Sequence, residues 1–434
     1  MNKGQALWDR AKSVIPGGNM LLSKRPEMHL PDIWPAYFSR AAGVTVWDLE
    51  DRAFTDMSLM SVGTNTLGYG HPSVDASVRG VIDAGNMSTL NAPEEVALAE
   101  RLVALHPWAD MARFARSGGE ANAIAIRIAR AASGRDGVAI CGYHGWHDWY
   151  LAANLGDAAG LDGHLLPGLD PAGVPRDLAG SVFPFAYNDL EALKSLVTDQ
   201  KIGVIKMEVS RSADPAPGFL QAVRDIADAH GIVLIFDECT SGFRQAFGGL
   251  HKIYGVDPDM AVFGKALGNG YAITAVIGRR AVMDAAQSTF ISSTFWTERI
   301  GPVAALATLD AMEDCRSWEV ITETGREITR RWQDLAASHG LTIRTRGLPA
   351  LTGFDIPGAR GLIYKTLITQ EMLKAGYLAG TSVYVSTEHR PDVLDRYFEA
   401  LDPVFALIAE CEDGRDPEAL LDGPVCHLGF SRLA

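Results

Sequence analysis

The chain has 434 residues, of which 47% are hydrophobic and 21% are charged, and its formal net charge at pH 7 is −14. This length exceeds what one small core can hold, so we expect two or three domains, or one large α/β domain with a smaller partner. A uniformly acidic surface disfavours nucleic acids and anionic membranes as partners, because both are polyanions.

Five cysteines lie far apart, at positions 141, 239, 315, 411 and 426. Their odd number and the lack of a C-x-x-C pair argue against a disulfide framework or a structural zinc site and fit a reducing compartment. The first residues contain no signal-peptide core, and no stretch approaches the ~20 apolar residues of a membrane span. The sequence therefore predicts a soluble, cytoplasmic protein.

The N-terminal region has mixed α and β patterns. Residues 5–14 predict a helix that ends at the Pro-Gly-Gly of residues 16–18. Residues 43–58 alternate apolar and polar side chains around an acidic turn, which is typical of a β-hairpin.

From about residue 93, amphipathic helices alternate with short apolar strands. The expected helices span residues 93–106, 120–133 and 219–231, and the expected strands span 202–210, 232–238 and 260–266. Residues 136–145 predict a further short strand that runs into a glycine turn. Strands that are apolar on both faces predict a mainly parallel sheet covered by helices on each side.

After about residue 310 the pattern changes again. A long amphipathic helix is predicted over 320–340, followed by short strands near 341–347 and 350–356. We therefore expect a large domain over 61–310 and a smaller C-terminal α+β domain over 311–434. Residues 1–60 are expected to pack with the smaller domain.

Three predicted strands end in reactive side chains, which parallel sheets place together at their carboxyl edge. They end near Glu208, at Asp237-Glu238 and at Lys265. The acids of "IVLIFDE" fit a magnesium-binding Walker B strand, but no phosphate-binding loop precedes them. The remaining interpretations are an aspartate that pairs with a protonated ring nitrogen, or an acid that caps a nearby helix.

Lys265 distinguishes these interpretations. A desolvated lysine has a lowered pKa and can form a Schiff base with an aldehyde. Pyridoxal phosphate (PLP) enzymes need such a lysine together with an acid on the pyridine nitrogen. Lys265 by itself is more consistent with a structural lysine, but Asp237 lies 28 residues upstream on a neighbouring predicted strand. The pair therefore favours PLP chemistry.

Other stretches could complete such a site. Ser117-Gly118-Gly119 precedes a helix, whose first N–H groups can hold a phosphate or can simply be capped by the serine. Tyr143 could stack on a flat cofactor or belong to a buried aromatic cluster. His144 and His147 have the spacing of a zinc pair but lack a clear third ligand. The hydroxyl-rich segment 288–302 could donate to a phosphate or form an ordinary polar loop.

Together these stretches resemble the class III PLP-dependent aminotransferases of fold type I, and most closely the glutamate-1-semialdehyde 2,1-aminomutase branch. The resemblance extends from about residue 15 to about residue 310, and "GIVLIFDECTSGFR", "DPDMAVFGKALGNGYAITAVIG" and "RSGGEA" carry most of it. It implies an α/β fold with a large domain built on a mainly parallel, seven-stranded type of sheet, plus a smaller α+β domain.

The resemblance also implies catalytic roles. Lys265 matches the Schiff-base lysine, which would also carry the substrate proton. Asp237 matches the acid on the pyridine nitrogen, Tyr143 the stacking aromatic, and Glu208 a glutamate placed near the ring. No metal is implied.

Further residues match cofactor-binding positions of the family. Ser117, Gly118 and Gly119 correspond to the phosphate loop, Cys239 to a residue on the ring face, and His144 to the "YHG" motif beside the cofactor. Thr294 resembles a threonine that reaches the phosphate from a second subunit, which implies a homodimer with shared active sites.

Departures from the family pattern concern the expected substrate region. Gly119 replaces a threonine of "SGTEA". Lys24 or Arg25 would replace residues that hold a substrate carboxylate, and Trp296 and Glu298 stand where the family has smaller residues. The predicted substrate residues are therefore Lys24, Arg25, Trp296 and Glu298.

The resulting functional prediction is transfer of an amino group from a small-molecule donor to an aldehyde or ketone acceptor. A similarity to aminomutase-related aminotransferases of surface-glycan pathways implies a glycan intermediate as one acceptor. A small semialdehyde and a β-amino compound are the others. An intramolecular aminomutase is the alternative, and a non-catalytic PLP-fold binding protein is a remote one.

Overall fold

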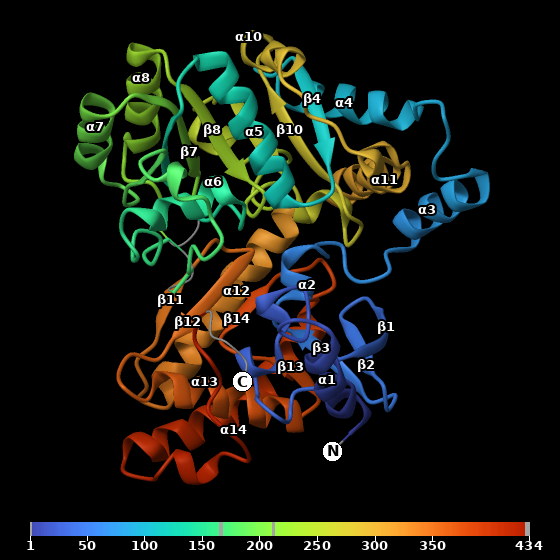
Figure 1. Cartoon of the computed structure of the whole chain (residues 1–434). Helices are drawn as coiled ribbons and strands as arrows, with labels where there is room; N and C mark the ends of the chain where they lie inside the picture. The colour runs from blue at the N-terminus through green and yellow to red at the C-terminus, as the bar shows by residue number, and fades with distance from the viewer. Residues whose placement is uncertain (1, 165–167, 211–212, 430–434) are drawn as a thin grey trace. The chain divides into compact units, whose positions relative to one another are not determined.

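The computed structural model describes residues 2–164, 168–210 and 213–429, and the chain divides into two compact units (Figure 1). The larger unit comprises residues 72–318, and the smaller comprises residues 1–71 together with 319–434. The sequence prediction instead placed the divisions at 60/61 and 310/311.

The larger unit is built on one seven-stranded sheet with the order β4-β10-β9-β8-β7-β5-β6. Its strands are β4 (Met111–Ala115), β5 (Gly137–Cys141), β6 (Val182–Pro184), β7 (Ile202–Glu208), β8 (Val233–Glu238), β9 (Met260–Phe263) and β10 (Thr274–Gly278). Only β10 runs antiparallel to its neighbours, β4 and β9. The predicted mainly parallel α/β sheet is confirmed.

Helices cover both faces of this sheet. The helices of the larger unit are α3 (Pro72–Ala84), α4 (Pro93–Leu105), α5 (Gly118–Ser133), α6 (Asp148–Leu151), α7 (Leu190–Asp199), α8 (Phe219–His230), α9 (His251–Tyr254), α10 (Arg280–Met283) and α11 (Ile300–Cys315). Helix α5 lies across the strands in Figure 1, and its buried Ile124 and Ile128 belong to one apolar cluster with Val138 and Val204. On the opposite face, His106 follows α4 and packs on Phe263, with ring centroids 5.0 Å apart.

The smaller unit contains two sheets. The strands β1 (Phe38–Ala42), β2 (Thr45–Asp48), β3 (Ala53–Met57) and β13 (Tyr377–Ala379) form one, and β11 (Arg344–Arg346), β12 (Leu351–Asp355) and β14 (Ser382–Tyr384) form the other. The parallel pairing of β3 with β13 joins the N-terminal residues to the C-terminal ones. The helices are α1 (Lys3–Val14), α2 (Met60–Gly63), α12 (Ser317–Ser338), which begins in the larger unit, α13 (Gly361–Lys374) and α14 (Pro391–Glu412).

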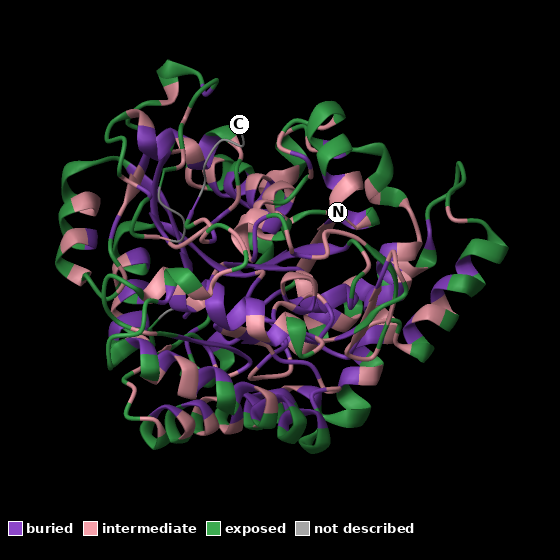
Figure 2. Ribbon diagram, turned by 90° about the horizontal axis from the view of Figure 1, so that it is seen from below, coloured by how far each residue is buried: buried purple, intermediate pink, exposed green. Residues whose placement is uncertain are grey.

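Each unit has its own core. In the smaller unit, Trp332, Phe354 and Phe405 are fully buried in one cluster. Figure 2 shows the strands mostly as buried and the outward faces of the helices as exposed. None of the described helices combines the length and apolar character that crossing a bilayer requires.

Candidate active site

The sheet of the larger unit brings the predicted reactive residues to one edge. Glu208 and Asp237 are register partners at the carboxyl ends of β7 and β8. The next strand, β9, ends at Phe263, two residues before Lys265. Because β4 runs in the same direction, Ser117 follows it at that edge as well. A parallel sheet therefore assembles four distant segments of the sequence.

Asp237 is buried and surrounded by donors. One carboxylate oxygen, Oδ2, accepts a hydrogen bond from His144 Nδ1 at 2.8 Å and lies 3.7 Å from Lys206 Nζ. The other, Oδ1, accepts from the backbone N–H of Cys239 at 3.1 Å. Burial opposes ionisation, but the Lys206 charge and the His144 hydrogen bond outweigh it and hold the pKa of Asp237 well below its usual range. The carboxylate is therefore a permanent negative charge.

Lys265 follows the carboxyl end of the neighbouring strand, β9, and has an unusual backbone conformation. Its φ is 45°, in the left-handed region that costs a non-glycine residue about 1–3 kcal/mol and is concentrated at functional sites. Its Nζ donates to Thr240 Oγ1 at 2.8 Å. The sequence placed Lys265 in the strand, but β9 ends at Phe263 and Lys265 begins the 3₁₀ turn Lys265–Gly268.

The predicted phosphate loop forms the N-terminus of α5. Ser117 is the N-cap residue, and the Glu120 carboxylate accepts its backbone N–H at 2.9 Å, which closes a capping box. Gly118 and Gly119 occupy the first turn, where N–H groups lack intrahelical acceptors and the helix dipole favours an anion. A Cβ on Gly119 would lie 2.7 Å from the His147 ring, so only glycine leaves this ring in place.

Cys239 connects the phosphate loop to the lysine. Its Sγ lies 3.5 Å from the point where a Cβ on Gly118 would stand and 3.3 Å from that point on Gly264. Burial and the Asp237 carboxylate raise the pKa of the Cys239 thiol well above its usual value, so the side chain is an uncharged spacer. The glycines on both sides allow three backbone segments to meet around it.

Tyr143 and Glu208 lie together beside this cluster. The Glu208 carboxylate is buried and accepts the backbone N–H of Tyr143 at 3.1 Å. The Tyr143 ring packs edge-on against Tyr150, with centroids 5.9 Å apart. The contact with buried Tyr150 supports a place for Tyr143 in an aromatic cluster. The position of Tyr143 after a strand that ends at the site is also consistent with stacking on a cofactor.

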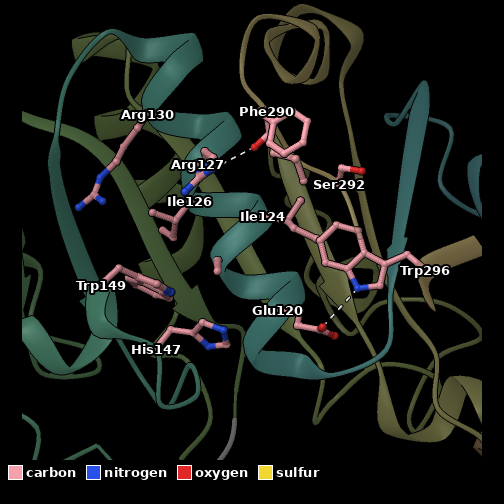
Figure 3. A pocket seen from close by; sticks show the side chains of 12 residues that line it. Glu120, Ile124, Ile126, Arg127, Arg130, His147, Trp149, Phe290, Ser292 and Trp296 are labelled. Carbon is pink, nitrogen blue, oxygen red and sulfur yellow. Dashed lines mark hydrogen bonds between the residues drawn. The ribbon is translucent and has the colours of Figure 1, made fainter. Parts of the chain in front are cut away.

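The predicted residues after residue 290 lie on another side of α5. Trp296 donates from Nε1 to Glu120 Oε1 at 3.2 Å and lines a pocket of about 500 Å³ with residues of α5 (Figure 3). Glu298 caps α11 by accepting the N–H groups of Ile300 and Gly301, and its Oε1 pairs with Arg116 Nε at 2.7 Å. Thr294 is exposed. The Glu298 carboxylate is therefore occupied by local partners.

Lys24 and Arg25 belong to the smaller unit. Lys24 ends the 3₁₀ turn Leu22–Lys24, and the Arg25 guanidinium lies against Gly17. Their assignment to a substrate stays a prediction.

Two site residues escaped the sequence analysis. Lys206 is fully buried next to Asp237, and Arg116 joins the phosphate loop to Glu298. A lysine in the apolar run "GVIKME" was a visible signal, because a cation in a buried strand needs a partner. Arg116 directly precedes Ser117 and has no comparable pattern around it.

These residues fit PLP. The ionised, buried Asp237 suits a protonated ring nitrogen, Lys265 supplies an amine at the next strand exit, and the first turn of α5 suits a phosphate. Within the described ranges, no three His, Cys, Asp or Glu side chains gather as a metal site would require. His144 of the suggested zinc pair is instead hydrogen-bonded to Asp237.

Comparison with known proteins agrees with this chemistry. The family model "Aminotransferase class-III" matches residues 30–386. The 3-aminobutyryl-CoA aminotransferase of Cloacimonas acidaminovorans is 32% identical over 85% of this chain and 87% of its own length. A glutamate-1-semialdehyde 2,1-aminomutase of Methanothrix thermoacetophila is 31% identical over 92% and 96% of the two chains.

The fold is also found in solved structures. The PLP form of the FumI protein from Sphingopyxis sp. MTA144 superposes with a TM-score of 0.85 and 25% identity, covering 96% of this chain and 99% of that one. The family match, the relatives and the site geometry lead to one conclusion. This chain belongs to the class III aminotransferases, fold type I enzymes that use PLP to transfer amino groups.

Proposed function

We propose that Lys265 holds PLP covalently, that Asp237 binds the ring nitrogen, and that Ser117, Gly118 and Gly119 bind the phosphate. One observation carries the proposal: a buried, ionised aspartate and a lysine stand at the exits of adjacent strands, beside the N-terminus of α5. Tyr143, His144, Glu208 and Cys239 complete the cofactor pocket.

The residues divide the work between proton transfer and charge. When bound, PLP supplies an aldehyde for the donor's amino group and a ring that accepts electrons from the donor's α-carbon. Lys265 removes and returns the α-proton as a general base and acid. Asp237 maintains a negative charge at the ring nitrogen because its donors keep it ionised.

We propose that the reaction uses a separate amino donor and a separate carbonyl acceptor. The acceptor is an aldehyde or ketone of a biosynthetic pathway: a glycan intermediate, a small semialdehyde or a precursor of a β-amino compound. The aminotransferase relative named for 3-aminobutyryl-CoA supports the last class. The second candidate is an intramolecular aminomutase, which the aminomutase relative covering 92% of this chain supports.

We further propose a cytoplasmic homodimer with shared active sites. Phe290 and Phe295 flank Thr294 and are 85% and 69% exposed, which marks an apolar surface of the kind that interfaces cover. The five cysteines have no disulfide partner, which suits a reducing compartment. Sedimentation of the holoenzyme as a monomer would contradict the shared site.

The covalent role of Lys265 is tested by borohydride reduction of the PLP-loaded protein followed by peptide mass spectrometry. We expect the added mass on the peptide that contains Lys265 and none in Lys265→Ala. We also expect that variant to lose kcat by about 10²–10⁴-fold, the typical effect of removing a proton-transfer group. PLP attached to any other lysine would overturn the assignment.

Transfer and isomerisation are separated by adding one compound at a time. With a donor amine alone, an aminotransferase converts its bound cofactor to the amine form, loses its visible absorbance and releases one equivalent of keto product. An aminomutase retains its single substrate and yields an isomer without releasing keto product. Glutamate, alanine and 3-aminobutyrate derivatives form a suitable first set of donors.

A further inference from the structure

Lys206 is a buried cation in an otherwise apolar layer. It lies in the middle of β7, is 0% exposed, and its register partners on both sides are the isoleucines Ile140 and Ile235. Side chains alternate along a strand, so Lys206 shares its face with Glu208 and with Asp237, the register partner of Glu208. Burying an ammonium is costly unless another charge compensates it.

The Lys206 ammonium points at the acid proposed for the cofactor ring. Its Nζ lies 3.7 Å from Asp237 Oδ2, and no described residue accepts a hydrogen bond from it. His144 already donates to that same oxygen at 2.8 Å. Asp237 is thus held by two side chains before any ligand binds, although a single donor would orient it.

The charged and titratable groups around this pair are few. Glu208 comes from the same strand, Cys239 from the end of β8, and His144 from the turn after β5. Burial lowers the pKa of Lys206, while Asp237, Cys239 and Glu208 act in the opposite direction. The nearest balancing anion is therefore the functional aspartate itself.

We propose that Lys206 is a positioning residue whose ammonium shares the Asp237 carboxylate with the cofactor's ring nitrogen, and so weakens the ring's hold on its proton. This proposal rests on the proposed binding of PLP between Asp237 and Lys265. A positive charge close to a protonated nitrogen disfavours the proton, and the effect is large where solvent is excluded. The chain thereby uses a buried lysine to adjust the electron-accepting strength of its cofactor.

The test measures the protonation of the ring nitrogen directly. PLP labelled with ¹⁵N in the ring is bound to wild type, Lys206→Met and Arg224→Met, and its NMR shift is followed with pH. We expect the proton to be lost at a pH at least about one unit higher in Lys206→Met than in wild type. Identical titrations, including a ring that stays protonated in both proteins, overturn the proposal.

Arg224→Met is the matched control. Arg224 is also a buried cation paired with an aspartate, Asp259, with Nη1 2.9 Å from Oδ2. That pair lies at the opposite end of the sheet, because the Asp259 carboxylate binds the backbone N–H of Leu234 near the start of β8. We expect Arg224→Met to titrate like wild type, so a shift in both variants would indicate a general effect of losing a buried charge.

A second measurement needs no variant. An analogue of PLP with carbon in place of the ring nitrogen cannot form the hydrogen bond to Asp237. If Lys206 weakens that bond, wild type should bind PLP no more than about tenfold more tightly than the analogue. A preference above about 100-fold overturns the proposal. A wild-type protein that binds neither compound contradicts the proposed cofactor site instead.

Discussion

Gly119 has no side chain where the His147 ring lies. A Cβ there would come within 2.7 Å of His147 Nδ1 and Cε1. We expect Gly119→Ala to displace this ring and to destabilise the protein by about 1–3 kcal/mol, the usual effect of overpacking. Urea denaturation measures the change, and equilibrium dialysis measures the accompanying loss of PLP affinity.

Gly80 offers a matched control for this substitution. It lies within α3, and nothing stands within 4 Å of the position of its missing Cβ. Gly80→Ala should stabilise the protein by about 0.5–1 kcal/mol, because alanine is the better helix former. Equal stability changes at Gly80 and Gly119 would rule out the steric explanation.

The sequence indicates which single residues are reactive better than it indicates which side chains surround them in the fold. Lys265 and Asp237 stand out because each ends an apolar run with a charge, and the larger unit does place both at one sheet edge. The pairing of His144 with Asp237 depends on how the turn after β5 folds back over 93 residues of sequence separation. No local pattern contains that information.

Arg116 and Glu298 fasten the start of α5 to the start of α11. The Arg116 guanidinium also donates to the backbone oxygens of Trp296 and Glu298, both at 2.9 Å. The side chains of Arg116 and Glu298 are both only 13% exposed. We expect Arg116→Met to destabilise the protein by about 3–5 kcal/mol, because it leaves a mostly buried carboxylate without its counter-charge.

The double variant separates the pair from its surroundings. Glu298→Gln keeps an oxygen for the N–H groups of Ile300 and Gly301 while removing the charge. Arg116→Met/Glu298→Gln should therefore be less destabilised than Arg116→Met alone, as measured by thermal denaturation. Additive losses would indicate that the two side chains do not interact.

Elements follow from periodicity, but their order in the sheet does not. The alternation of apolar runs and amphipathic helices predicts the strands around β7, β8 and β9 and the helices α5 and α8. It does not predict that β10 lies between β4 and β9, antiparallel to both. That placement depends on long-range pairing. Residues 274–278 are an apolar run like the other strands, so their sequence does not indicate their partners.

Two histidines make the stability of the whole molecule depend on pH. Burial lowers the pKa of His29 in the smaller unit to about 4, and that of His106 in the larger unit to about 4. Their unfolded pKa is near 6.5, so between pH 6.5 and 4 the unfolded chain binds more protons. The contribution of these two histidines to stability is therefore fully present above pH 6.5 and is lost as the pH falls toward 4.

The slope of this loss can be measured for each histidine. Each contributes up to about 1.4 kcal/mol per pH unit within the window. His106→Asn and His29→Asn should each flatten the pH dependence of the urea midpoint, while lowering the midpoint at pH 8. An unchanged slope in either variant would show that the substituted histidine does not titrate in this way.

The boundary between the two units appears in the sequence only as a change in the pattern of apolar and polar residues. α11 continues the larger unit to residue 315, so the change of pattern near residue 310 lies within a helix. In the smaller unit, β13 joins residues 53–57 to residues 377–379. The sequence of neither strand alone predicts such a pairing across more than 300 residues.

The position of β10 also has a consequence for folding. β10 pairs with β4 at Thr274–Ala115, across about 160 residues, and β4 leads directly to Ser117. Because closing such a long loop is slow, we expect β10 to pair first with β9, which is close to it in sequence, and the edge strand β4 to join β10 late. Binding of PLP would then report the last step of refolding, and chains that end before residue 274 would never acquire it.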